Sequence, residues 1–220
     1  MMKKQTVLML FLCIILLSGC LGPSPEENIY QTLEEVASLE DTFKEQQEPL
    51  LELEKKESEI YNKIMDLGMT EFDQVVSLSK EAITVVEDRE SKIEAEHDSI
   101  MSSKKKFEEM TDNIANIKDE ELRDSANQLK KTMEDRYKSY ETLFKNYETS
   151  LTLDKELYTM LQKEDLTIKE LDAQISKINA AYKSVMEQNE EFNKYTEQYN
   201  EQKMTFYEQA ELDVKIDGNE

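Results

Sequence analysis

The chain has 220 residues, with 27 lysine and arginine residues against 49 aspartate and glutamate residues, and its formal net charge is −22. A surface of this sign repels nucleic acids, anionic lipid headgroups and anionic wall polymers, so no nucleic-acid partner is expected. The two cysteines, Cys13 and Cys20, lie at or before position 20. The rest of the chain can therefore form no disulfide, cysteine-ligated zinc site or cysteine nucleophile. With only 4 Gly and 3 Pro, the composition favours long helices.

Residues 1–19 have the organisation of a lipoprotein signal peptide. Lys3 and Lys4 precede an apolar run over residues 7–17 that is too short to remain as a membrane span. The run ends in a lipobox-like sequence that consists of Leu17, Ser18, Gly19 and Cys20. A prolipoprotein needs the cysteine, because its thiol takes a diacylglycerol before cleavage, and two acyl chains anchor a protein stably. We expect Cys20 to carry the lipid; the alternatives are an ordinary signal peptide and an uncleaved anchor with a chance cysteine.

Apolar stripes with helical spacing follow the signal peptide. They predict long helices over residues 25–67, 71–116, 120–163 and 168–210. Residues 20–24 then form only a short tether, and the acidic residues 211–220 are expected to fray. Gly68 is a natural helix stop, whereas Pro49 falls inside a stripe that resumes in phase, so we expect a kink there and no boundary. Helix starts are predicted from capping residues at Ser24, Thr70, Asp119 and Thr167.

Helices of this length with short connections run antiparallel to their sequence neighbours. The predicted fold is all-α: an elongated antiparallel up-and-down four-helix bundle with coiled-coil-like packing, which the sevenfold spacing from Val86 to Ile114 indicates. This order places the start of the first helix and the C-terminus at the membrane end, and the turns at Gly68 and Asp165 at the far tip. The competing architecture is a two- or three-helix coiled coil that oligomerises, because an apolar stripe does not identify the partner that covers it.

The single histidine, His97, ends the sequence Glu94-Ala95-Glu96-His97, which matches the Glu-x-x-His element of di-iron bundles. Such sites need a second histidine, which this chain lacks. His97 also lies on the apolar stripe, between Ile93 and Ile100. We therefore interpret it as a structural residue, and no metal or cofactor is expected.

Polar side chains on the stripes are the other candidates for chemistry. They could form a functional polar core, but control of helix register is the simpler interpretation; they are Glu90, Lys104, Asp154 and Asn189. The tyrosines of the last two helices are interpreted mainly as core residues whose hydroxyls reach the edge of the core. Without a spare histidine, a Gly-rich phosphate loop or paired cysteines, the sequence favours no enzyme.

The lipobox, the four long charged helices and the segment Ile175-Ser176-Lys177-Ile178-Asn179-Ala180-Ala181-Tyr182 resemble the YkyA-like "putative cell-wall binding lipoprotein" family of Bacillus and related Gram-positive bacteria. The resemblance covers essentially the whole chain. It implies an up-and-down helical bundle, lipid-anchored on the outer face of the cytoplasmic membrane, and it supplies no catalytic residues.

The leading hypothesis is accordingly a non-enzymatic, membrane-anchored helical rod that binds the cell wall, as peptidoglycan, or an envelope protein. An acidic surface repels wall polyanions unless divalent cations bridge them, so peptidoglycan itself is the more favourable wall ligand. The first alternative is a protein-interaction or chaperone-like module for exported proteins. The second is a metal-binding bundle around His97.

Overall fold

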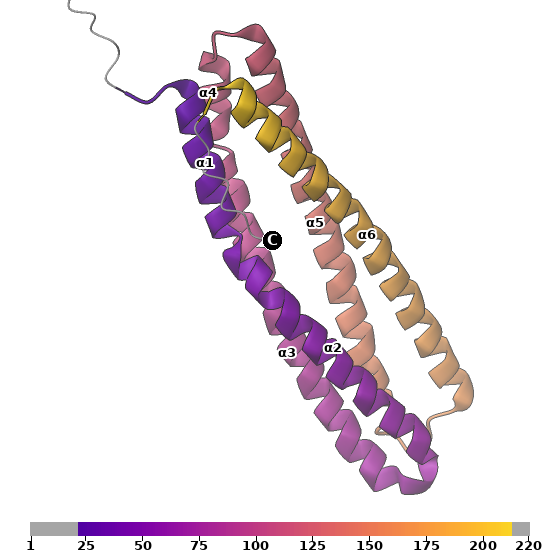
Figure 1. Ribbon diagram of the computed structural model, residues 1–220. Helices are drawn as coiled ribbons and strands as arrows, with labels where there is room; N and C mark the ends of the chain where they lie inside the picture. The colour runs from indigo at the N-terminus through magenta and orange to yellow at the C-terminus, as the bar shows by residue number, and fades with distance from the viewer. Residues whose placement is uncertain (1–21, 213–220) are drawn as a thin grey trace, which may run out of the picture.

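The computed structural model describes residues 22–212. Its helices form four long arms that run alternately up and down: α1 with α2, α3 with α4, α5, and α6 (Figure 1). The bounds are α1 Pro25–Leu39, α2 Asp41–Leu67, the 3-10 helix η1 Gly68–Glu71, α3 Phe72–Phe107, α4 Met110–Asn116, α5 Glu120–Met160 and α6 Ile168–Gln209. The all-α, antiparallel four-helix bundle predicted from the stripes is confirmed.

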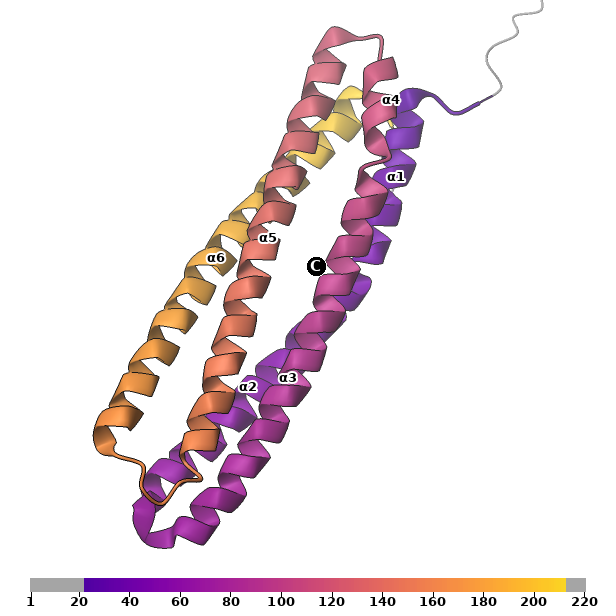
Figure 2. The same cartoon turned by 180° about the vertical axis from the view of Figure 1, so that it is seen from behind.

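The two ends of the bundle hold the connections that the up-and-down order requires. The start of α1, the α4–α5 connection and the end of α6 lie together at one end, here called the Ser24 end (Figures 1 and 2). Helix η1 and the α5–α6 connection lie at the other end, here called the Gly68 end. Most of the stripe residues therefore pack on one another within one chain, in two clusters.

Local hydrogen bonds explain where α1, α5 and α6 start. The Ser24 hydroxyl accepts the Glu27 N–H at 3.1 Å, and the Glu27 carboxylate accepts the Ser24 N–H at 2.7 Å, which is a complete capping box. Asp119 caps α5 by accepting the Leu122 N–H at 2.9 Å. Thr167 caps α6 in the same way as Ser24 caps α1.

The predicted cap at Thr70 is wrong. Residues 68–71 form η1, so α3 begins only at Phe72, and the Thr70 hydroxyl donates backwards to the Leu67 carbonyl at 3.0 Å. Gly68 ends α2 with φ 59° and ψ −170°. A side chain is strained in this backbone conformation, which explains why the stop is a glycine.

Two long predicted helices are each divided. The helix predicted over residues 25–67 is divided into α1 and α2 at Glu40, whose N–H bonds to the Ala37 carbonyl in a tightened turn. Pro49 does not interrupt α2. The second interruption separates α3 from α4 after Phe107, where the Glu109 N–H likewise bonds three residues back. Both are short local turns without glycine or proline, which the sequence analysis did not predict.

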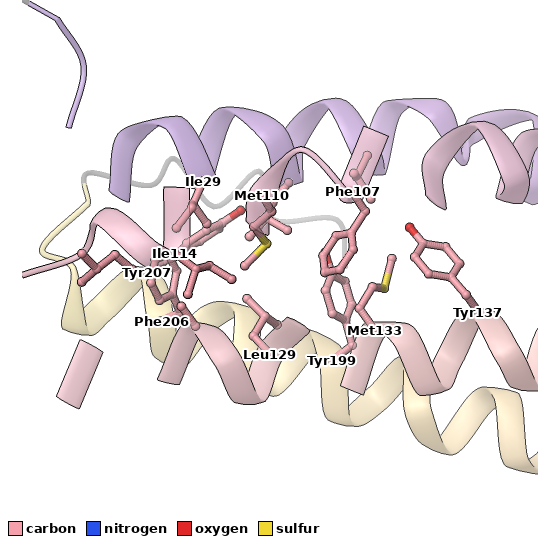
Figure 3. Close-up of a cluster of buried hydrophobic side chains, with 14 of the residues drawn as sticks. Ile29, Phe107, Met110, Ile114, Leu129, Met133, Tyr137, Tyr199, Phe206 and Tyr207 are labelled. Atoms are coloured by element: carbon pink, nitrogen blue, oxygen red, sulfur yellow. The ribbon is translucent and has the colours of Figure 1, made fainter. Parts of the chain in front are cut away.

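The core consists of two apolar clusters, one at each end. At the Ser24 end α6 contributes fully buried aromatic side chains, among them Phe206 and Tyr207, which close on Ile29 and Met110 (Figure 3). At the Gly68 end the fully buried residues come from α2, α3 and α5, and α6 adds only partly buried side chains. Helix α6 is thus held firmly at one end of the bundle and loosely at the other. Between residues 22 and 212, no helix combines the length and hydrophobicity needed to cross a membrane.

Candidate functional site

A half-open groove lies between α2 and α6, over the Gly68-end cluster. Its cavity volume is about 320 Å³, at the lower end of the range of about 300–1,000 Å³ for small-ligand sites. Helices α2 and α6 form the walls, and the floor consists of polar side chains from α2, α3 and α5. The lining residues are Glu54, Glu57, Ser58 and Tyr61 of α2, Arg89 of α3, Asp154, Leu157 and Tyr158 of α5, and Ile175, Ile178, Asn179 and Tyr182 of α6.

The groove exists because the first part of α6, residues 168–188, is only partly covered. Gln174 is its single buried residue, and its amide donates to the Leu153 carbonyl at 2.9 Å. Ile168 is 78% exposed, and Met186 is 61% exposed. The apolar stripe of α6 was expected in the core; for Ile168 this is wrong, whereas Leu171, Ile178 and Val185 pack, partly buried, against the Gly68-end cluster.

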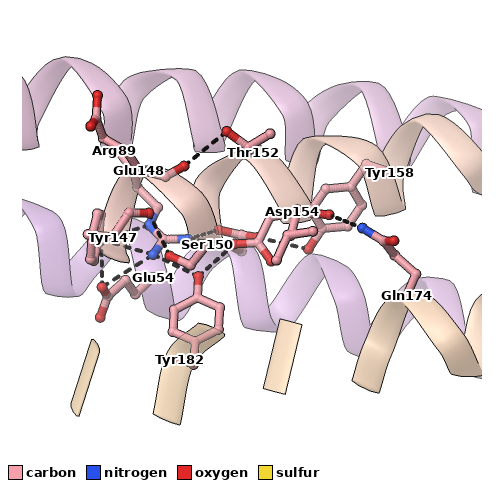
Figure 4. A network of polar contacts seen from close by, with 12 residues as sticks. Glu54, Arg89, Tyr147, Glu148, Ser150, Thr152, Asp154, Tyr158, Gln174 and Tyr182 are labelled. Atoms are coloured by element: carbon pink, nitrogen blue, oxygen red, sulfur yellow. Dashed lines mark hydrogen bonds and ion pairs between the residues drawn. The ribbon is translucent and has the colours of Figure 1, made fainter. Parts of the chain in front are cut away.

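Arg89 forms the centre of the floor and is 1% exposed. Its Nη2 donates to the hydroxyls of Tyr147 at 2.8 Å and Tyr182 at 3.0 Å, and its Nε donates to Tyr147 at 3.1 Å. Its Nη1 donates to the Glu57 carboxylate and lies 3.5 Å from Asp154 Oδ2. Figure 4 shows Arg89, Tyr147, Asp154 and Tyr182, from α3, α5 and α6, converging on one another. The guanidinium is therefore fully engaged by its own neighbours.

Tyrosine hydroxyls connect the carboxylates of the floor. Tyr182 donates to Asp154 Oδ2 at 2.6 Å, Tyr158 donates to Glu57 at 3.1 Å, and Tyr147 donates to Glu54 at 2.7 Å. Burial raises the pKa of the Tyr182 and Tyr158 phenols well above their ordinary value, so they remain neutral donors.

The floor carries more negative than positive charge. Burial, reinforced by repulsion from Glu57, raises the pKa of Asp154 to about 6, so this carboxyl group is mostly ionised at neutral pH. Three carboxylates, from Glu54, Glu57 and Asp154, then face the single guanidinium of Arg89.

A second buried ion pair lies towards the Ser24 end and lines no cavity of this kind. Arg136 Nη1 and Nη2 each donate to the Glu40 carboxylate at 2.8 Å. Ser103 donates to the same carboxylate at 2.7 Å, and Arg136 Nε donates to the Thr196 hydroxyl at 2.9 Å. This pair joins the turn between α1 and α2 to α5 and explains why Glu40 points inward.

Another buried carboxyl group lies between the two clusters. Glu96 is 2% exposed and accepts a hydrogen bond from the Gln47 amide at 2.5 Å. Burial raises its pKa to about 8. Glu96 is thus protonated at neutral pH, unlike Asp154.

The predicted polar residues have different surroundings. Asp154 lies in the groove floor, whereas Glu90 and Lys104 form partly exposed ion pairs with Lys155 and Glu141. Asn189 is exposed and interrupts no core. Sequence reasoning missed Arg89, although its position three residues after Val86 and four before Ile93 is a signal that a charged side chain faces the core.

His97 stacks on the ring of Phe144 with centroids 4.1 Å apart, an arrangement typical of aromatic packing. Among residues 22–212, no three potential histidine, cysteine or carboxylate ligands gather as a metal site. Most of the predicted core tyrosines are buried, among them Tyr140 and Tyr199. The lipobox residues Leu17, Ser18, Gly19 and Cys20 lie outside the described residues, as does most of the acidic tail.

The fold and the groove define a class of protein: an elongated helical bundle with one open flank near one end. The chain belongs to the YkyA family, whose description is "Putative cell-wall binding lipoprotein" and whose model matches residues 24–209. The family resemblance found in the sequence is thereby confirmed.

Two individual proteins are similar to this chain. The "Uncharacterized lipoprotein YkyA" of Bacillus subtilis (strain 168) is 38% identical over 153 residues, which are 70% of this chain and 69% of that protein. A conserved protein of unknown function from Staphylococcus aureus, known from a crystal structure, aligns with a TM-score of 0.73 at 19% identity, over 86% of this chain and 98% of that chain. The second similarity concerns the fold alone.

Proposed function

We propose that this protein is a non-enzymatic, lipid-anchored rod on the outer face of the cytoplasmic membrane, and that it binds peptidoglycan through the groove between α2 and α6. The observation that carries the proposal is the position of the groove. It lies in the half of the bundle away from Ser24, and Ser24 is separated from the expected lipid on Cys20 by only a short tether.

The geometry of the helices gives the scale of this separation. At a rise of about 1.5 Å per residue, the path from Ser24 to Glu57 along α1 and α2 is about 50 Å. A groove at that height would lie clear of the lipid headgroups and face the wall. The acidic surface supports the same orientation, because it is repelled by an anionic membrane.

The non-enzymatic part of the proposal is supported by the state of the groove residues. The Arg89 guanidinium and the carboxylate of Glu57 are held in hydrogen bonds with their neighbours. The lining residues include no histidine and no thiol. The groups in the groove that could act as a base are carboxylates, and they are bonded to Arg89 or to tyrosine hydroxyls, an arrangement suited to holding a ligand.

The test is co-sedimentation of the mature lipoprotein, kept in mild detergent, with purified sacculi. Binding should be saturable on sacculi stripped of teichoic acids and should not depend on millimolar calcium. Absence of binding to stripped sacculi in every condition would refute the proposal. Binding only in the presence of both teichoic acids and calcium would instead assign recognition to bridged polyanions.

The anchor is tested separately. Changing Cys20 to Ala should leave the precursor unprocessed or release the protein from the membrane fraction, because no thiol remains to take the diacylglycerol. A variant that matures normally and stays anchored would contradict the assignment of Cys20.

A second candidate function is binding of an envelope protein or of exported chains, as in the chaperone-like alternative. It is favoured by the apolar edge of α6, where Ile168 and Met186 are exposed. A photo-crosslinking residue at Met186 should then capture a protein in cells, whereas a groove that serves peptidoglycan alone should give no protein adduct.

A further inference from the structure

We propose that the groove between α2 and α6 recognises a primary amine on a short peptide, with the ammonium group held at Asp154 and Glu57 and the peptide lying between the two helices. This inference rests on the proposed function and adds the chemistry of the ligand. Peptidoglycan contains short peptides, and their free amino groups would be the recognised feature.

The charge of the groove favours a cationic ligand. The single cation among the lining residues is Arg89, and it is already bonded to Tyr147, Tyr182 and Glu57. It has no direction left in which to bind an anionic ligand. The surplus charge of the floor is therefore negative, and an ammonium group would neutralise part of it inside the half-open groove, at the buried side chains of Asp154 and Glu57.

The neighbouring hollows of the surface differ from this groove because lysine side chains line them. The hollow on the other side of the α5–α6 pair is lined by Lys155, Lys163 and Lys177, and the one between α2 and α3 by Lys56 and Lys92. Within the described part of the chain, no lysine lines the groove between α2 and α6. A cationic ligand would thus meet no competing ammonium group there.

Asp154 has a carboxylate oxygen that can accept a hydrogen bond from a ligand. Asp154 is 4% exposed and lines the cavity. The contacts that it receives from Tyr182 and Arg89, at 2.6 and 3.5 Å, both fall on Oδ2. Over residues 22–212, no hydrogen bond reaches its Oδ1. Because each carboxylate oxygen has two lone pairs, Oδ1 remains available to accept an N–H from a ligand.

The walls of the groove are suited to the methylene chain and the ammonium group of an amine-bearing side chain. Ile175, Ile178 and Leu157 offer apolar surface for a methylene chain, and the Tyr61 ring lines the opposite wall of the groove. Aromatic rings attract cations across their faces. A volume of about 320 Å³ admits a side chain with a few peptide atoms, and it excludes a folded domain.

The direct test uses two short peptides that differ only at one lysine, one with a free Nζ amine and one with Nζ acetylated. They are titrated against the mature lipoprotein in detergent by isothermal calorimetry. Saturable binding of the amine peptide, weakened at least about tenfold by acetylation, would support the proposal; a tenfold change corresponds to about 1.4 kcal/mol. Equal binding of the two peptides, or binding of neither, would overturn it.

Variants locate the binding site. Asp154→Asn should weaken binding of the amine peptide about tenfold. Glu148→Gln removes the same charge from an exposed position on α5 and should leave binding unchanged. If Asp154→Asn fails to fold, Ile178→Lys tests the same point, because it places a competing ammonium group on the wall. Unchanged binding in a folded groove variant, or an equal loss in Glu148→Gln, would refute the assignment to this groove.

Binding to chemically modified sacculi distinguishes a failure of this inference from a failure of the proposed function. Sacculi treated with acetic anhydride should lose most of the binding seen with untreated sacculi. Undiminished binding after acetylation would overturn the amine inference and leave peptidoglycan binding intact. Absence of binding to untreated sacculi would refute peptidoglycan binding, and the peptide titration would still decide whether the groove binds amines.

Discussion

The buried pair of Glu40 and Arg136 makes the sharpest prediction about stability. Changing Glu40 to Ala removes both 2.8 Å hydrogen bonds and leaves the guanidinium, 3% exposed, with Thr196 as its remaining polar partner nearby. Removing one partner of a buried pair costs about 3–5 kcal/mol, because the other charge is left uncompensated. That is a large share of the roughly 5–15 kcal/mol by which domains are stable.

Urea unfolding followed by helical circular dichroism measures this loss. The matched control is Glu45→Ala, which removes an exposed carboxylate from α2 and should change the unfolding free energy by no more than about 0.5 kcal/mol. The double replacement Glu40→Leu with Arg136→Met should recover much of the loss, because it leaves no unpaired charge. A loss below about 1 kcal/mol for Glu40→Ala would show that solvent screens this pair, as at exposed ion pairs, and would refute the reasoning.

Three further outcomes are expected. Gly68→Ala should cost about 1–3 kcal/mol in urea unfolding because of its positive φ, whereas Gly22→Ala, with open space and no such φ, should be neutral; equal effects would contradict the backbone argument. Folded Glu96 keeps its proton up to about pH 8 while unfolded Glu96 loses it near its ordinary pKa, so stability falls as pH rises between these values. Glu96→Gln should flatten that decline and exceed the parent in stability at pH 9; an unchanged pH profile would argue against a raised pKa. His97→Gln loses the stacking on Phe144 and should cost only about 0.5–1.5 kcal/mol; loss of bound metal together with surface function would instead revive the metal-binding alternative.

The helix starts could be predicted wherever a capping side chain fixes them, as at Ser24 and Thr167. The turn at Glu40 could not, because no glycine or proline marks it and the groups that bond to it, Ser99 of α3 and Arg136 of α5, are distant in sequence. The groove was equally hidden. An apolar stripe indicates that Ile175 and Ile178 prefer to be buried, but it does not indicate how far α2 lies from α6. The polar floor was predicted only in part, through Asp154.

The uneven burial of α6 also predicts that its first half opens locally more often than its second half. Residues 168–188 contribute one buried side chain, whereas residues 189–209 contribute four aromatic ones. Local opening favours segments with little buried apolar surface, so backbone amides in the first half of α6 should exchange with deuterium faster than those in the second. The Ser24 end then keeps its shape while the Gly68 end opens locally, and a ligand bound in the groove would stabilise the Gly68 end alone.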